Sequence, residues 1–422
     1  MNRIVKWLLI AVGVVVLVLA CVVFALQRWV GSDDFRERVA QQISEAAGVP
    51  VKLGGISVSV WPLPAVALEQ VQVQSKPALT LERVEARPVW AGLLRGRLEI
   101  STLIVRNAVV PELAVTAIAA AFQKKRGAAP KPADGKGSMA FIPKRTLLDH
   151  VTWVQAKGGR QTVNAEAQLD DDGLPASVRA EVVEGKFTGA KGTMDREGDQ
   201  WALKVDIAGG TIAGKVGLKP GAKGGSMLKG QLDTANVEIS QLTAPSKTLT
   251  GRLEARTTLS AEFRDAGAIA DALQTQTKFT VRNAVVHGID LAQAVKTVGM
   301  NRGGETHLDT LAGNVNTQGR TVHVTNLVAT SGALSANGNV TMTPERNLSG
   351  RVTVDLTSAA VGGALGVPLV VGGTLDSPSV TLSRSALVGA AIGTVLAPGV
   401  GTGAGATLGD KLGSGLKGLF GK

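Results

Sequence analysis

The chain has 422 residues, of which 44% are apolar and 3% aromatic, with 52 glycines, no tyrosine and a formal net charge of +11. This length suffices for two or three domains or one long repetitive one, and a core of Val, Leu, Ile and Ala favours strands. Few aromatic side chains can stack on bases and the sequence holds no nucleic-acid-binding motif, so an anionic membrane surface explains the charge better than nucleic acid. The single cysteine, Cys21, excludes an internal disulfide or a cysteine-based metal site.

An uncharged apolar segment opens the chain. The 20 residues Trp7–Leu26 carry no charge, and as a helix they would span about 30 Å, the thickness of one bilayer core. We interpret residues 1–30 as a short stub and an uncleaved transmembrane anchor, since a cleaved signal peptide has a shorter apolar stretch. The alternative is a lipoprotein, because Val18–Cys21 resembles a lipidation box. The flanking basic residues do not decide the orientation.

An amphipathic helix and a long series of strands follow. Ser32-Asp33-Asp34 supplies an N-cap and negative charge, apolar residues recur every four positions, and Gly48 is a stop signal, which predicts a helix of about twelve residues. From Val49 the period changes to two, in short runs separated by Gly, Pro, Asn and Asp. This pattern predicts an antiparallel sheet with one apolar and one polar face. Short helices are expected within residues 265–276 and 291–298.

Two features punctuate the strand series. Residues 121–145 have no apolar period and are strongly basic, which predicts a flexible linker that is dispensable for folding. The hexapeptide Val105–Val110 recurs letter for letter as Val281–Val286, which indicates equivalent strand ends in a structure that repeats one strand-turn unit.

The C-terminal residues 383–422 form a Gly-rich tail. Small residues four apart would make a smooth stripe on a helix, Pro398 interrupts it, and a short basic amphipathic segment ends the chain. We expect this tail to be disordered until it meets a membrane or a partner. The candidate contact residues are Gly401, Gly405, Gly409, Gly413, Leu412, Leu416, Leu419 and Phe420.

Catalytic chemistry is not visible in the sequence. The four histidines, His150, His287, His307 and His323, form no ligand-spaced pair, and the chain holds no HExxH, P-loop or GxSxG motif. Asp170–Gly173 begins like a calcium loop, but the loop is not completed downstream, so we expect a solvated turn. We therefore expect no enzyme activity, no cofactor and no bound metal.

Several blocks, in this order and spacing, resemble the AsmA family. They are Asp33–Arg36, Gly48–Leu53, Ile56–Pro62, Leu93–Ile100, Ala284–Leu291 and Val367–Pro378. The resemblance covers both ends of the chain and leaves residues 131–259 to generic strand patterning. It implies an inner-membrane anchor, a periplasmic remainder, and a long twisted sheet curled into a groove, as in bridge-like lipid transfer proteins. It also implies a role in outer-membrane homeostasis and in moving phospholipid between the two membranes.

The residues and the resemblance together predict a mainly β fold: an N-terminal transmembrane helix, then an elongated, twisted antiparallel sheet curled into an apolar groove, with a few short helices. A sheet with one apolar face and few helices must curl or close on itself, so an ordinary β-sandwich core is the alternative. We assign residues 31–120 to an AsmA-like N-terminal helix and strands, and residues 146–382 to the groove with an AsmA-like C-terminal region. The candidate groove-lining residues are Ile56, Val58, Val60, Val71, Val73, Val322, Val324, Val340, Val352 and Val354.

The expected partners follow from this fold. A phospholipid or another acyl lipid would occupy the groove, since each buried methylene contributes about 0.8 kcal/mol. The inner membrane would hold the anchor, and the tail could reach the outer membrane or envelope proteins. The competing hypothesis is a structural or regulatory factor for outer-membrane assembly that binds proteins and carries no lipid.

The anchor hypothesis predicts the topology. An alkaline phosphatase fused after Gly48 should be active and a cytoplasmic reporter at the same place silent, because residues after Val30 would lie in the periplasm. The opposite pair of signals would overturn the topology. A mature N-terminus at Cys21, found by mass spectrometry, would establish the lipoprotein alternative.

Overall fold

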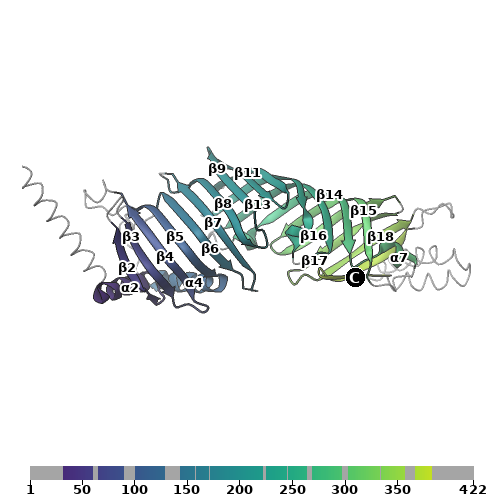
Figure 1. Cartoon of the computed structure of the whole chain (residues 1–422). Coiled ribbons are helices and arrows are strands. Elements are labelled where there is room, and N and C mark those ends of the chain that lie inside the picture. The colour runs from purple at the N-terminus through teal and green to yellow at the C-terminus, as the bar shows by residue number, and fades with distance from the viewer. Residues whose placement is uncertain are drawn as a thin grey trace, which may run out of the picture. The chain divides into compact units, whose positions relative to one another are not determined.

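The computed structural model of the chain describes residues 32–59, 65–89, 100–128, 143–156, 158–170, 172–221, 225–244, 246–263, 269–296, 303–332, 334–356 and 366–382. The chain divides into two compact units, residues 1–195 and 196–422. Both are built mainly of strands, with a few helices (Figure 1). The predicted mainly β fold is therefore confirmed. The predicted anchor and the Gly-rich tail lie outside the described residues, among which no helix is long and apolar enough to cross a bilayer.

The N-terminal unit combines a sheet with two helices. Strands β1 and β2 both pair with β3, and the sheet continues from β3 in chain order. The pairing of β5 with β6 is parallel, because helix α4 carries the chain back between them. The elements are α2 (Asp33–Ala47), β1 (Val51–Lys52), β2 (Gly55–Ser59), β3 (Ala65–Val73), β4 (Leu79–Pro88), β5 (Ile100–Pro111), α4 (Glu112–Ala128), β6 (Arg145–Val154), β7 (Arg160–Leu169), β8 (Pro175–Gly185) and β9 (Lys191–Glu197).

The C-terminal unit is an antiparallel meander in which successive strands are neighbours. Its strands are β10 (Gln200–Ile207), β11 (Gly210–Pro220), β12 (Ser226–Glu238), β13 (Leu249–Phe263), β14 (Gln274–His287), β15 (Glu305–Gln318), β16 (Thr321–Ser331), β17 (Leu334–Met342), β18 (Leu348–Leu356), β19 (Val367–Thr374) and β20 (Ser377–Leu382). The short helices α5 (Ile239–Thr243), α6 (Ile269–Ala272) and α7 (Leu291–Lys296) connect them, the last two within the ranges predicted from sequence.

The strand register confirms that each sheet has one apolar face. Val315 stands opposite Val324, and on the next strands Val352 stands opposite Leu369. The residues that alternate with the apolar ones along each strand face the other side of the sheet, where polar and charged side chains meet. On β12 and β13, for example, Arg256 Nε lies 2.9 Å from Asp233 Oδ1 in an ion pair. Because side chains alternate along a strand, this arrangement follows directly from the period of two in the sequence.

Helix α2 covers part of the apolar face of the N-terminal unit. Ser32 caps it, accepting a hydrogen bond of 3.4 Å from the Phe35 amide, and Gly48 ends it with φ 71°. The apolar side of the helix packs on strands β1–β4 in a cluster of Phe35, Val39, Ala40 and Ile43 with Val51, Leu53, Ile56 and Val71. The amphipathic helix predicted after the anchor is therefore confirmed.

The repeated hexapeptide carries an asparagine at positive φ in both of its copies. Asn107 in β5 and Asn283 in β14 adopt φ 48° and 50°, and the alanine after each is almost fully buried. Asn tolerates this left-handed conformation better than other non-glycine residues. The hexapeptides thus occupy equivalent places, as predicted, within the later halves of their strands. At Asn283 the register between β13 and β14 also shifts, and such a bulge bends its strand and strengthens the local twist.

Further bulges follow on neighbouring strands of the C-terminal unit. Register shifts occur at Asn236, Gly251, Gly313 and Asn326, between β12 and β17. At Gly251, with φ 130°, the amide donates a hydrogen bond of 3.0 Å to Glu238 Oε1. Burial alone would raise the pKa of Glu238, but the amides of Gly251 and Ser240 and the Ser240 hydroxyl donate to it, so its pKa is lowered.

The structure corrects the boundaries of the predicted linker. Helix α4 extends to Ala128 and strand β6 begins at Arg145, so both ends of the stretch 121–145 are regular structure. Residues 129–142 lie outside the described part. The end of this helix was not predictable from the sequence, because Ala119–Ala121 and the basic residues after them lack an apolar period.

The bulge at Asn283 can be tested by substitution. Asn283→Val should lower the free energy of unfolding by about 1–3 kcal/mol, because a β-branched residue is strained at positive φ. Asn316→Val is the matched control, since Asn316 lies exposed in β15 without a positive φ and Val favours strands there. Chemical denaturation of both variants measures the difference. Equal stability of the two would show that the bulge is not under strain.

Candidate functional site

The apolar face of the C-terminal unit is fully covered in one region. Val354 and Leu369 are 0% exposed, and they belong to a core cluster drawn from strands β14–β20 and from helix α7. The other buried members are Val281, Ala284, Ile289, Ala294, Leu308, Leu311, Ala329, Leu334, Ala336, Val352, Val367, Val371, Val380 and Leu382. These strands curl until their apolar residues meet each other, so the end of the sheet is a packed plug.

A second region of the same face is only half-buried. Val315, Val322 and Val324 lie on it, beyond the bulges of β15 and β16, and they are not members of the core cluster. The apolar residues of β10–β12 are half-buried in the same way, and these are Leu203, Val205, Ile207, Ile212, Val216, Leu218, Leu228 and Leu232. We call this set the open apolar face. Its side chains are accessible to a ligand, whereas those of the plug are not.

The open apolar face carries no charge of its own. The residues that alternate with it, such as Lys204, Lys215 and Asp233, are exposed on the opposite side of the sheet. An ion pair of 2.7 Å from Lys215 Nζ to Glu197 Oε2 illustrates how these charges are satisfied there. An apolar chain on the open face therefore meets no fixed charge.

The candidate groove residues fall into three groups. Val322 and Val324 lie on the open apolar face, and Val340 is half-buried at the margin of the plug. In the N-terminal unit, Ile56 and Val71 are buried beneath helix α2, and Val58 and Val73 are half-buried against that cluster. Val352 and Val354 are buried in the plug. Val60 lies outside the described residues.

This distribution corrects the prediction of one groove lined by all these positions. At Ile56, Val71, Val352 and Val354 the protein's own side chains fill the space beside the sheet. Sequence reasoning missed the open strands β10–β12 among its candidates, although Leu203-Val205-Ile207 shows the same alternation.

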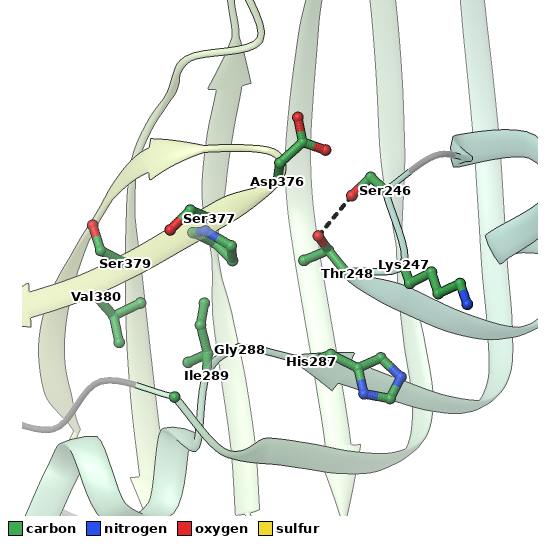
Figure 2. Close-up of a pocket in the computed structure, with 12 residues that line it drawn as sticks. Ser246, Lys247, Thr248, His287, Gly288, Ile289, Asp376, Ser377, Ser379 and Val380 are labelled. Atoms are coloured by element: carbon green, nitrogen blue, oxygen red, sulfur yellow. Dashed lines mark hydrogen bonds between the residues drawn. The ribbon is translucent and has the colours of Figure 1, made fainter.

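A cavity of about 790 Å³ with a mixed polar and apolar lining lies in the C-terminal unit, next to the plug. Three separate segments form it: residues 246–248, residues 287–289 with Gly303, and residues 376–380 of the final hairpin (Figure 2). The Thr248 hydroxyl donates a hydrogen bond of 2.6 Å to the Leu375 carbonyl, and the Ser246 hydroxyl donates one of 3.2 Å. These two bonds fasten the last hairpin to the loop before β13.

The cavity brings together the two C-terminal blocks that resemble AsmA proteins. Gly288, from the first block, lies beside Pro378, from the second, and a Cβ added at Gly288 would meet the Pro378 Cγ at 3.7 Å. The His287 ring lies on the same side as Lys247 (Figure 2) and pairs with Glu305, with 2.9 Å between Nδ1 and Oε1. The blocks thus have a visible structural role, which is to close the sheet.

The remaining polar candidates do not assemble into a reactive site. His150 lies 2.7 Å from Asp149 and His323 lies 3.2 Å from Thr341, on exposed strand surfaces far from His287 in the chain. Within the described ranges no group of three side chains could hold a metal ion. Asp170 Oδ1 accepts hydrogen bonds from the amides of Asp172 and Leu174, so the predicted turn is confirmed.

Residues 1–113 match the model of the AsmA family. The N-terminal region of the chain is therefore similar to that family. This match covers the predicted anchor, helix α2 and strands β1–β5, and it confirms the resemblance noted for the N-terminal blocks. No curated protein and no solved structure matches the chain.

The hydrogen bond that holds the last hairpin can be tested by substitution. Thr248→Val keeps the shape of the side chain but removes the donor to the Leu375 carbonyl, and it should cost about 1–2 kcal/mol of unfolding free energy. Thr258→Val is the control, because its hydroxyl is exposed and makes only a long bond of 3.4 Å to the Gln276 carbonyl. Thermal unfolding compares the two variants. A cost no larger than that of the control would mean that the hydroxyl does not fasten the hairpin.

Proposed function

We propose that this protein is anchored in the inner membrane, holds acyl chains on its open apolar face in the periplasm, and contributes to phospholipid transport between the inner and outer membranes and to outer-membrane homeostasis. The observation that carries the proposal is the half-buried, uncharged band on β10–β12 and on Val315, Val322 and Val324. The similarity of residues 1–113 to the AsmA family supports the envelope role. The anchor and the compartment rest on the sequence and on the family resemblance.

An acyl chain fits this face for a physical reason. Each methylene that leaves water contributes about 0.8 kcal/mol, so a chain laid along several strands gains much of its binding energy without any specific contact. The charged head group can remain in water while the chain is covered. Since one aliphatic side chain follows another across β10, β11 and β12, no single position would trap the lipid.

Two covered regions of the apolar face restrict where an acyl chain can bind. In the C-terminal unit the plug around Val354 and Leu369 leaves no room for a ligand. In the N-terminal unit helix α2 fills the apolar face over β1–β4. Lipid would therefore bind beside these covered regions, on strands whose apolar residues are half-buried.

Photo-crosslinking tests the proposal directly. A crosslinking amino acid at Val205 or Val324 should capture phospholipid in cells, whereas probes at Lys204 and His323, on the polar face of the same strands, should not. Mass spectrometry of the crosslinked protein gives the readout. Equal labelling of the two faces, or none at Val205 and Val324, would contradict the lipid hypothesis and leave the assembly-factor hypothesis ahead.

Placing an aspartate on the open apolar face or in the plug distinguishes a loss of lipid binding from a loss of folding. Val324→Asp should give folded protein that no longer captures lipid, because water can reach a carboxylate on the open face. Val354→Asp should instead destabilise the C-terminal unit by about 4 kcal/mol, because the carboxylate would be buried without a partner in the plug. Protein yield and unfolding curves distinguish the two. If both variants unfold alike, Val324 belongs to a closed core and the open face is not a binding surface.

A further inference from the structure

Exposed apolar side chains gather at one end of the strands of the N-terminal unit. Leu113 and Val115, in the first turn of α4, are 49% and 37% exposed, and Trp153, near the end of β6, is 37% exposed. Side chains of this size are usually covered when several lie together on a surface. We call these three residues the apolar tip.

The strand register places Trp153 beside the start of α4, which carries the other two members of the tip. Val110, at the end of β5, stands opposite Trp153, and helix α4 begins two residues later. A hydrogen bond of 2.9 Å from the Ala156 amide to Glu112 Oε2 ties the start of α4 to the loop after β6. Both helix start and strand end are therefore held in place, so the tip is part of the folded unit.

Basic side chains flank the tip along the same edge of the sheet. Arg160 stands opposite Val154 on the next strand, and Gly185 stands opposite Gln161 on the strand after that, which brings Lys186 to this edge. Lys186 Nζ lies 4.7 Å from the centre of the Phe187 ring. The nearby carboxylates are engaged internally, Glu112 with the Ala156 amide and Glu184 with the Thr162 hydroxyl. The edge thus combines apolar side chains with positive charge.

We propose that this edge of the N-terminal unit docks on the surface of an anionic lipid bilayer, with the apolar tip inserted among the lipids and with Arg160 and Lys186 at the head groups. Trp at an interface with apolar neighbours and flanking cations is the composition that binds such surfaces. A second copy of the chain fits less well, because a two-fold contact through this edge would bring the cations of both copies together. The proposal goes beyond the lipid-carrying function and does not depend on it.

Trp153 connects the docking edge to the apolar face of the N-terminal unit. Trp153 shares its face with Val151 and, across the pair, with Val163. The apolar tip is therefore where the apolar face of this unit reaches the ends of its strands. Docking would set that face against the bilayer, where a lipid could leave the membrane without crossing water.

Fluorescence quenching in proteoliposomes tests the docking with the full chain. Cys21→Ser removes the natural cysteine, and Leu113→Cys then carries an environment-sensitive dye. Val66→Cys is the matched control, since Val66 is 41% exposed in the same unit. Val66 stands opposite Ala86, which stands opposite Leu103 near the start of β5, so it lies at the ends of the strands away from the apolar tip. In vesicles containing phosphatidylglycerol and brominated phosphatidylcholine, the dye at position 113 should shift to the blue and be quenched, and the dye at position 66 should not.

The charges provide the second arm of the test. Arg160→Gln with Lys186→Gln should lower the ratio of docked to undocked protein roughly 30-fold, because each cation near an anionic surface contributes about a fivefold preference. Vesicles of phosphatidylcholine alone should lower the ratio at least as much. Circular dichroism confirms that the variants are folded. Equal quenching at positions 113 and 66, or none at either, overturns the proposal. A blue shift at position 113 without quenching by bromolipid, growing with the protein-to-lipid ratio, would assign the edge to a second copy instead. Crosslinking of lipid at Val324 is independent of all these outcomes.

Discussion

The structure depends on one constraint: a long series of strands carries its apolar residues on a single face, and the described helices are too few and too short to cover it. In most folds a second layer hides such a face. Here the face is hidden in part by α2, in part by the sheet's own curl over β14–β20, and elsewhere only halfway. What remains open is the feature that a lipid could use.

The bulges determine where the curl occurs. In the C-terminal unit, positive-φ residues lie at register shifts between neighbouring strands, and each such bulge adds twist; they are Asn236, Gly251, Asn283 and Asn326. In β15 and β16 they separate the residues that enter the plug, such as Leu311 and Ala329, from the half-buried Val315 and Val324. A bulge therefore divides a single strand into a stretch that stabilises the fold and a stretch that is accessible. The hydroxyls of Ser246 and Thr248 then hold the final hairpin against the curled sheet.

The match to the AsmA family and the open apolar face lie in different parts of the chain. The AsmA match ends at residue 113, close to the start of α4, while the open apolar face lies on β10–β12 and β15–β16. The N-terminal region contributes the helix-capped start of the sheet and the edge that carries Leu113 and Trp153. The C-terminal unit contributes the candidate binding face and the plug. The proposed lipid binding rests on the C-terminal unit, and the proposed membrane docking rests on the N-terminal unit.

The sequence by itself determined the local features. The period of two predicted one apolar face for each sheet, the caps at Ser32 and Gly48 predicted α2, and the repeated hexapeptide predicted equivalent positions in β5 and β14. These succeed because side-chain alternation, capping and the tolerance of Asn for positive φ are set by neighbouring residues.

Only the tertiary structure decided which part of the apolar face stays open. Val324 and Val354 stand in the same alternating pattern, yet one is half-buried and the other is fully buried in the plug. The parallel return from β5 to β6 and the bond from Thr248 to Leu375, 127 residues away, are likewise invisible in a local pattern. Coverage of a face depends on how far the sheet curls and on what reaches it from distant parts of the chain, and a period of two along one strand contains no information about either.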